Sequence, residues 1–394
     1  MPALNCRHGF FVSLGFMRKT LAVLTLIALA ACGKGSNDAA APPSGGGGGA
    51  GKVHFLVLGD TGAATPLNTD QQGESANVAA VAKKVCDLRG CDFALLAGDN
   101  IYEMGAAAEV DPLFQVAFER PFAGLSFPFF LALGNHDNSN TFVGEGSNNF
   151  KGDAQVSYTS SPVNTSHKWN MPDRYYAQAW PAGSANPALE VFVLDSSPIS
   201  HFFDDPNPLW SGTMLSDYIA AQKVFVQDAL AASKAPWKFA LAHHPYISNG
   251  NHGNAGNFDV GASQDPCSIA GPLASASCRG TDYKAFIEDT ICGKVDVFFT
   301  GHDHNLYWLK PAAACAKTQH ILSGAGSKAR DTLDANRNPA LYQEGGLFGF
   351  FWVELDGDTF RGAAYEVQAG GTPNAADGAG NPLPAFETTF SRQP

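Results

Sequence analysis

Five short apolar runs in this chain are each followed by a cluster of polar residues, in most cases after a single glycine. The runs are rich in Val, Phe and Leu, which is typical of strands buried on both faces. Helical stretches lie between them, at 75–88, 112–122 and 215–232. Strands alternating with helices predict an α/β fold with mainly parallel sheets, in which ligands bind where loops leave the carboxyl ends of strands. The five runs are 53–58, 93–97, 127–133, 239–242 and 295–300.

The polar clusters after these runs contain residue types that bind metal ions. Taken singly, each cluster is weak evidence, because turn formation and helix capping explain such residues as well. Their joint occurrence at five strand ends favours a metal site. A mixture of carboxylate, phenol and imidazole suits iron, manganese or zinc rather than calcium. The candidate ligands are Asp60, Asp99, Tyr102, Asn135, His243, His302 and His304.

The charge balance argues against nucleic acid as a partner. The chain has 37 acidic and 25 basic residues, a formal net charge of −12. A field of that sign repels a phosphate polymer. Beyond the N-terminal region no apolar segment reaches the roughly 20 residues of a spanning helix, so we expect the body of the protein to lie outside the membrane.

The first 32 residues resemble a targeting signal. A short basic start precedes an apolar run at 20–31, which ends at Cys32. This order is typical of a bacterial lipoprotein signal with Cys32 as the lipidated residue; a plain secretory signal with a chance cysteine is the alternative. We therefore expect an exported envelope protein, periplasmic or attached to the outer membrane, that touches the membrane only through its lipid. Residues 33–51 predict a flexible tether, and 371–394 an irregular tail.

The cysteines after the signal suggest disulfide bonds. An even number of cysteines in an exported chain is typical of complete pairing, here into three bonds. Fifteen connectivities are open, and pairing between nearest neighbours in the sequence is preferred. No CxxC pair exists, which disfavours a structural zinc site. The preferred pairs are Cys86–Cys91, Cys267–Cys278 and Cys292–Cys315.

The order of the five clusters carries a resemblance. They read GDxG at 59–62, GDxxY at 98–102, GNHD at 134–137, HxP at 243–245 and GHxH at 301–304. This order resembles the calcineurin-like metallophosphoesterases and, within them, the purple acid phosphatases of the small, tartrate-resistant type. The resemblance implies a four-layer αββα sandwich of two mixed sheets flanked by helices, in one catalytic domain over residues 52–370.

Two positions narrow the resemblance to the purple type. Most of the superfamily has a metal-binding His two residues after the first Asp, where this chain has Gly62. Purple enzymes instead use a Tyr three residues after the second Asp, and Tyr102 stands there. The alternative for Tyr102 is a packing aromatic.

The resemblance implies two metal ions that share Asp99. A ferric ion is expected on the side of the phenolate and carboxylates, which neutralise its charge, and a second divalent ion (iron, zinc or manganese) on the imidazole-rich side. The ferric ligands would be Asp60, Asp99, Tyr102 and His304. The ligands of the second ion would be Asp99, Asn135, His243 and His302.

The implied activity is the hydrolysis of phosphomonoesters by a metal-bound hydroxide, with a small phosphorylated molecule or a phosphoprotein as substrate. His136 is expected at the substrate phosphate. His252 is expected to protonate the leaving group, with an exposed loop histidine as the alternative. His244 replaces the Tyr of the resembled enzymes and either contacts substrate or packs. The rival functions are a phosphodiesterase or nucleotidase on the same scaffold, or a non-catalytic envelope lipoprotein that has no need of seven ligands.

Overall fold

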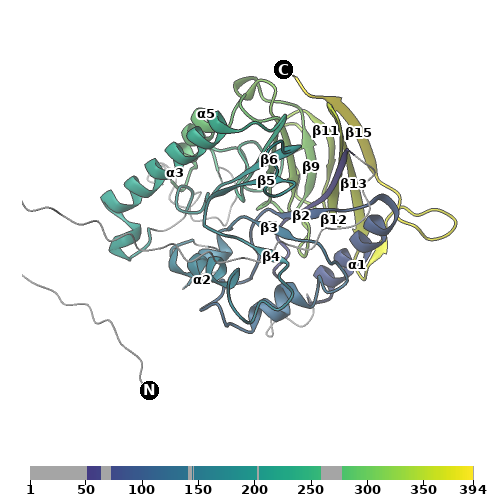
Figure 1. Ribbon diagram of the computed structural model, residues 1–394, viewed down its shortest axis with the longest axis horizontal. Coiled ribbons are helices and arrows are strands. Elements are labelled where there is room, and N and C mark those ends of the chain that lie inside the picture. Colours follow the sequence, from purple (N-terminus) through teal and green to yellow (C-terminus); the bar gives the residue numbers. More distant parts are fainter. Residues whose placement is uncertain are drawn as a thin grey trace, which may run out of the picture. The chain divides into compact units, whose positions relative to one another are not determined.

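Two mixed sheets pack face to face, and helices cover their outer faces (Figure 1). The computed structural model describes residues 51–63, 72–140, 144, 146–201, 204–258 and 277–393. These all belong to one compact unit, Pro42–Pro394. The predicted signal and nearly all of the predicted tether lie outside the described residues. The four-layer αββα architecture is thus confirmed for the body of the chain.

The first sheet joins the N-terminal strands of the unit to the C-terminal ones. Its order is β14-β13-β12-β1-β2-β3-β4, and β15 pairs with β13. Strands β1 to β4 run parallel, whereas β12 lies antiparallel to both β1 and β13. The strands are β1 Lys52–Leu58, β2 Phe93–Leu96, β3 Phe129–Leu131, β4 Trp169–Asn170, β12 Phe348–Asp356, β13 Thr359–Gln368, β14 Thr372–Pro373 and β15 Phe386–Ser391.

The second sheet contains the strands of the middle of the chain. Its order is β11-β9-β10-β8-β7-β6-β5, and β10, β8, β7 and β6 are parallel. The strands are β5 Tyr176–Trp180, β6 Leu189–Val193, β7 Trp237–Leu241, β8 Val297–Thr300, β9 Leu306–Leu309, β10 Gln319–Ser323 and β11 Ala340–Glu344. All five predicted runs are therefore strands, and all five belong to parallel parts of the two sheets.

Burial on both faces explains why these strands show no polar–apolar alternation. In β7, Phe239 and Leu241 join the core between the sheets, whereas Ala240 joins the core on the helix side of the second sheet. Aromatic rings close the space between the sheets: the ring centroid of Phe55 on β1 lies 5.9 Å from that of Phe239 and 6.0 Å from that of Phe299. Both side-chain sets of such a strand must be apolar.

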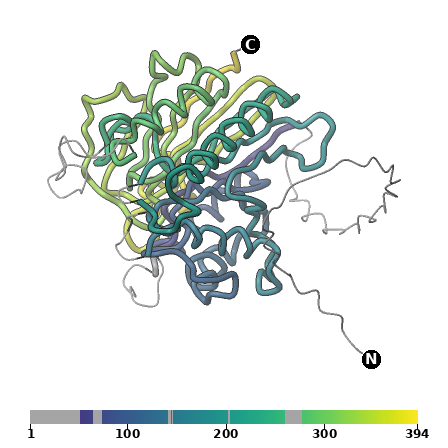
Figure 2. Tube along the Cα trace, turned by 90° about the vertical axis from the view of Figure 1, so that its left-hand side faces the viewer, coloured from purple at the N-terminus to yellow at the C-terminus, as the bar shows by residue number. Residues whose placement is uncertain are grey.

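Two of the three predicted helices are confirmed. Figure 2 views the molecule from the side on which helix α3 (Gly212–Ala232) lies, and α3 is in front of the strands there. The remaining prediction, 112–122, is wrong in extent: only residues 113–119 are helical, the last five of them as a π-helical segment, Gln115–Glu119, and turns flank them. Pro121 has no backbone N–H and its ring clashes with the preceding turn, so a regular helix cannot run through it. The helices are α1 Gln72–Arg89, α2 Phe150–Tyr158, α3 Gly212–Ala232 and α5 Thr281–Thr290.

The C-terminal segment corrects the domain boundary. Residues 371–394 were expected to be irregular, but β14 and β15 lie there and β15 pairs with β13 through six residue pairs. Phe386 and Phe390 share one face of β15 and both lie 6.1 Å, centroid to centroid, from the ring of Trp308. Phe386, Thr388 and Phe390 alternate with the more exposed Glu387, Thr389 and Ser391, which is a strand pattern that the Gly- and Pro-rich average of the segment hides. The catalytic domain therefore extends past residue 370 to Ser391.

Two of the three preferred disulfide bonds are present. Cys86 bonds to Cys91, which ties α1 to the loop before β2, and Cys292 bonds to Cys315. The third preferred pair includes Cys267, which lies outside the described residues. Among the residues that the structure describes, no helix is both long enough and apolar enough to cross a membrane.

Candidate metal centre

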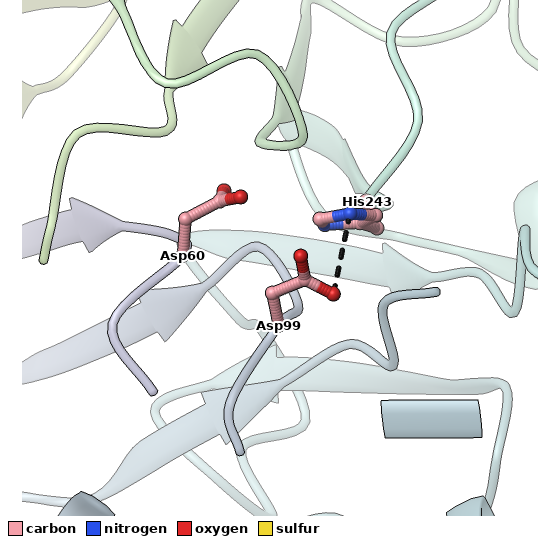
Figure 3. Close-up of side chains that lie close together, drawn as sticks. All are labelled: Asp60, Asp99 and His243. Atoms are coloured by element: carbon pink, nitrogen blue, oxygen red, sulfur yellow. Dashed lines mark ion pairs between the residues drawn. The ribbon is translucent and has the colours of Figure 1, made fainter. Parts of the chain in front are cut away.

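The five predicted loops meet where the parallel strands of the two sheets end. Asp60 follows β1, Asp99 follows β2, and His243 follows β7 of the other sheet. Figure 3 shows these three side chains pointing toward one another. One ligand atom from each lies within 4.8 Å of the others. Side chains separated by up to 183 positions in sequence are thus brought to one point, and the remaining candidates surround them in two groups.

The first group consists of Asp60, Tyr102 and His304. The Tyr102 hydroxyl lies 2.9 Å from Asp60 Oδ1 and 3.2 Å from His304 Nε2. His304 Nε2 is in turn 3.3 Å from Asp60 Oδ1. A carboxylate, a phenol and an imidazole therefore present their donor atoms to a common point, which is a donor set suited to iron.

The second group consists of Asn135, His243 and His302. His243 Nε2 lies 2.7 Å from Asn135 Oδ1, and His302 Nδ1 lies 3.1 Å from each of these two atoms. His243 Nδ1 donates to the backbone carbonyl of Ala97 at 2.8 Å, so in the neutral ring Nε2 keeps its lone pair. The group offers one amide oxygen and imidazole nitrogens, a softer set than the first.

Asp99 lies between the two groups. Its Oδ1 is 3.4 Å from His243 Nε2, and its carboxylate also interacts with the Tyr102 hydroxyl. The backbone N–H of His136 donates to the same Oδ1 at 3.0 Å, which fixes the carboxylate. The Asp99 carboxylate thus contacts side chains of both groups, as a shared ligand must; the Asp60 carboxylate reaches the second group only through the backbone N–H of His302, at 2.9 Å.

Three candidate ligands have the left-handed backbone that non-glycine residues rarely adopt. The φ angle is 55° at Asp60, 52° at Asp99 and 76° at His302. Such conformations cost on the order of 1–3 kcal/mol each and cluster at functional sites, where the surrounding structure enforces them. The turn after each strand therefore aims its first polar side chain into the site instead of along the surface.

Burial sets the protonation of the ion-free site. It raises the pKa of Asp60 to about 7 and that of Tyr102 well above its usual range. Burial also opposes the charged form of Asp99, but the neighbouring His243 and His136 lower the pKa of Asp99 to about 2. The pKa values of His302 and His304 lie well below the ordinary value because burial disfavours their charged forms. Neutral imidazoles with free lone pairs are ready to bind metal, and the Tyr102 hydroxyl would have to lose its proton if Tyr102 bound a metal ion as well.

A family model for the calcineurin-like phosphoesterases matches residues 53–306, which contain every loop described above. The chain belongs to this family. Among curated proteins, it is 26% identical to purple acid phosphatase 3 of Arabidopsis thaliana over 328 residues, covering 80% of this chain and 75% of the relative. It is 27% identical to tartrate-resistant acid phosphatase type 5 of Sus scrofa, covering 70% of each chain. The resemblance to purple acid phosphatases is thereby confirmed.

Solved structures show the same fold at low identity. A structure described as GAP50, the anchor in the inner membrane complex of Plasmodium, matches with a TM-score of 0.60 at 16% identity, over 87% of this chain and 90% of that one. Purple acid phosphatase PPD1 from yellow lupin seeds matches with a TM-score of 0.54 at 17% identity, over 86% of this chain and 54% of that one. These likenesses establish the fold of this family member and nothing more.

Gly62 shows why this phosphoesterase has no His after its first Asp. A Cβ atom at Gly62 would collide with the backbone of Asn100 and Ile101. Backbone hydrogen bonds hold this contact, from Gly62 N–H to Asp99 O at 3.0 Å and from Tyr102 N–H to Gly62 O at 3.0 Å. The loop that delivers Tyr102 therefore fills the space that a side chain at position 62 needs.

The three remaining predicted histidines lie at the edge of the centre. His136 donates through Nδ1 to the Glu103 carbonyl at 2.8 Å, and its Nε2 lies 4.0 Å from Asp99 Oδ2. The ring centroid of His252 lies 4.2 Å from that of His302. His244 packs 4.6 Å from the same His302 ring, and its Nδ1 lies 2.8 Å from Ser196 Oγ.

Two acidic residues, Asp137 and Asp303, accept hydrogen bonds from the backbone of the loops around the centre. Asp137 accepts the backbone N–H of Ile101 at 2.9 Å and that of Gly134 at 2.8 Å, so it fixes the loop that carries Tyr102. Asp303 accepts the backbone N–H of His252 at 3.0 Å. Asp137 therefore fixes backbone next to the candidate ligands Tyr102 and Asn135, and Asp303 fixes the backbone of His252.

Sequence reasoning missed three features of the site. The loop after β10 packs against the loop after β1 and brings Lys328 to Tyr102. The sequence at 321–326 shows a strand followed by glycines, but it contains no residue of a type that binds metal. His201, without a motif, lines a cavity with Asn135, His244 and His302. Arg174 forms a buried ion pair with Asp195 (Nε to Oδ2, 2.8 Å), for which no local pattern exists.

Proposed function

We propose that this chain is an acid phosphatase that hydrolyses phosphomonoesters with a ferric ion and a second divalent ion. One observation carries the proposal: two groups of three donor side chains lie on either side of a shared carboxylate, and one group contains a tyrosine. The similarity to purple and tartrate-resistant acid phosphatases supports the same activity. We assign Asp60, Asp99, Tyr102 and His304 to iron, and Asp99, Asn135, His243 and His302 to the second ion, which is iron, zinc or manganese.

Bound in these groups, two metal ions supply an activated water and positive charge that offsets the phosphoryl oxygens. The chain's own residues do the rest. The Ala97 carbonyl holds His243 in the tautomer whose Nε2 faces the site. The Glu103 carbonyl likewise accepts a hydrogen bond from His136 Nδ1, so the other ring nitrogen, Nε2, is directed toward Asp99. We expect substrate phosphate oxygens at that position. Protonation of Nε2 as well would make His136 a cation that donates a hydrogen bond to a phosphate oxygen, and a preorganised donor of this kind stabilises the charge of the transition state.

We assign leaving-group protonation to His252. Its ring lies tilted beside that of His302, and Asp303 accepts a hydrogen bond from its backbone, so the side chain lies at the rim on the side of the second ion. Replacing His252 with Ala is expected to slow alkyl phosphomonoesters by about 10²-fold or more and aryl esters with good leaving groups far less, because only poor leaving groups need the proton. Steady-state rates on a series of esters of graded leaving-group pKa measure this difference.

Replacing the exposed His167 with Ala is the matched control, and we expect its rates to equal those of the unsubstituted chain. Equal slowing of all esters by His252→Ala would assign His252 to phosphate binding instead. Unchanged rates on every ester would remove His252 from the mechanism.

Metal analysis and an activity assay test the proposed function directly. The purified chain, supplied with iron and zinc during expression, is expected to contain two metal ions and to cleave a p-nitrophenyl monoester faster than the corresponding diester. Faster cleavage of the diester would favour the phosphodiesterase alternative. Two bound metal ions without any hydrolysis would favour a binding protein.

We propose further that the chain is an envelope lipoprotein anchored through Cys32. The proposal rests on the order of basic start, apolar run and cysteine, all outside the described residues. We expect the full chain to sediment with bacterial membranes, and the Cys32→Ser variant to appear in the soluble fraction. A Cys32→Ser variant that still sediments with membranes would contradict the lipid anchor.

A further inference from the structure

Lys328 is a cation held directly over the proposed iron ligand Tyr102. Its Nζ lies 3.6 Å from the centroid of the Tyr102 ring. The Tyr102 side chain is buried, with 1% of its surface exposed, and that of Lys328 is 18% exposed. A cation over the face of an aromatic ring is attracted by the ring electrons, and the attraction is stronger where water is excluded. Because the ring is buried, this contact is energetically favourable and is not an incidental approach of a surface side chain.

The loop that carries Lys328 has a fixed position. The Ser327 hydroxyl donates to the Asp60 carbonyl and accepts the backbone N–H of Ala63 at 3.2 Å. The Gly326 N–H donates to the Gly59 carbonyl at 3.1 Å. The backbone before Lys328 is thus bonded to the turn that presents Asp60, so the ammonium and the ligand set are positioned by the same contacts.

A carboxylate fixes the end of the side chain. Lys328 Nζ lies 2.9 Å from Glu103 Oε1, and Glu103 is the residue after Tyr102. The two partners of Lys328 are therefore consecutive residues, one contacted by charge pairing and the other through its ring. A lysine serving only as a surface ion pair has no need to lie over the buried ring as well.

We infer that Lys328 is a positioning residue that tunes the metal centre by stabilising the negative charge of the Tyr102 phenolate. The inference rests on the proposed function, since it takes Tyr102 as a ligand of the ferric ion. Tyr102 has to lose its proton in a site that already contains Asp60 and Asp99, and the three negative charges repel one another. Lys328 supplies a compensating positive charge at the ring without occupying a ligand position.

The direction of the effect follows from where the charge sits. Exciting a phenolate–iron(III) complex with visible light moves an electron from the ring toward the metal. The ammonium stabilises the ground state, in which the charge is on the ring, more than the excited state. Removing the ammonium is therefore expected to lower the transition energy and to shift the absorption band to longer wavelength. It also makes the phenolate a stronger donor, so the iron(III)/iron(II) midpoint potential is expected to fall.

The test compares Lys328→Met with Lys328→Arg in the iron-loaded protein. Methionine has similar length but no charge, whereas arginine keeps the charge and can remain over the ring. We expect the absorption band of Lys328→Met to move to longer wavelength at unchanged iron content, and that of Lys328→Arg to stay near the band of the unsubstituted chain. Spectra and metal analysis are read before any assay, so the result does not depend on turnover.

A third variant separates charge at the ring from the ion pair. Glu103→Gln breaks the ion pair but leaves the Lys328 ammonium over the ring, and the charge of that ammonium is then less neutralised. The absorption band of Glu103→Gln is therefore expected to move to shorter wavelength. A shift to longer wavelength in both Glu103→Gln and Lys328→Met would mean that the ion pair is structural, and this result would overturn the inference.

The remaining outcomes distinguish the inference from the proposed function. A coloured unsubstituted chain whose band does not move in Lys328→Met would overturn the role of Lys328 and leave the metal assignment intact. An iron-loaded unsubstituted chain without any such band, or one whose band persists in Tyr102→Phe, would overturn Tyr102 as ligand and the inference with it.

Discussion

Replacing Asp99 with Asn is expected to lower kcat/KM by roughly 10³-fold or more. This is at least the upper end of the loss that follows when one charge-stabilising group is removed from an active site. Asp99 is the side chain that contacts both donor groups, through His243 and Tyr102. Asparagine keeps the shape but loses the charge that offsets two cations. We therefore expect the purified variant to contain less than the full pair of metal ions, measured by elemental analysis beside steady-state kinetics.

Asp92 provides a matched control at the other end of β2. It precedes β2, whereas Asp99 follows it, and it accepts the backbone N–H of His54 at 2.8 Å, a role that asparagine can keep. Asp92→Asn is expected to retain both metal ions and full activity. Full metal content and near-normal rates in Asp99→Asn would show that the two groups do not share this carboxylate.

Replacing Arg174 with Met is expected to cost about 3–5 kcal/mol in the free energy of unfolding near neutral pH, because it leaves the charge of Asp195 buried and unpaired. Arg174 Nε lies 2.8 Å from Asp195 Oδ2, and the Asp195 side chain is fully buried. The same guanidinium donates to Asn138 Oδ1 at 3.1 Å, three residues after the proposed ligand Asn135. Chemical denaturation of the metal-loaded protein measures the loss.

The loss at Arg174 is expected to depend on pH in a definite direction. Burial raises the pKa of Asp195, and Arg174 opposes that rise, so the pKa of Asp195 should rise further in Arg174→Met. The penalty applies only while Asp195 is ionised. It is therefore full above the raised pKa of the folded variant and decreases as the pH falls from that value toward the lower pKa of the unfolded chain. We expect the stability difference from the unsubstituted chain to be larger at pH 8 than at pH 5.

A double variant checks the cause. Arg174→Met combined with Asp195→Asn removes the unpaired charge and is expected to recover part of the lost stability. An Arg174→Met chain as stable as the unsubstituted chain at both pH values would show that the ion pair contributes nothing. A loss that is the same at both pH values would assign the effect to packing against Trp210, which lies 4.6 Å from the guanidinium.

The strands and the ligand loops could be predicted because each is encoded locally. An apolar run followed by a glycine and an aspartate is visible within ten residues, as at Gly59 and Asp60, and parallel strands place such ends on one edge. The family resemblance added the grouping of the ligands. Strand β15 was missed because its six residues were averaged with a Gly- and Pro-rich surrounding.

The supporting contacts could not be predicted, because they depend on pairs far apart in sequence. Arg174 and Asp195 are separated by 21 positions, and Lys328 and Glu103 by 225. A lone lysine or arginine is most often a solvated surface residue, so neither position stands out from its neighbours. Only the folded chain shows which of them face a buried carboxylate or a buried ring.

The close packing of Gly62 on the Asn100–Ile101 backbone also limits how this centre could have arisen. A histidine introduced at 62 would displace the segment that presents the phenol, and a chain that lost the phenol first would lack one donor of the candidate metal centre. Either substitution made alone would therefore give an enzyme whose set of donor side chains is displaced or incomplete. The exchange of one ligand type for the other therefore requires coordinated change in both loops, and descendants of either arrangement are expected to keep it.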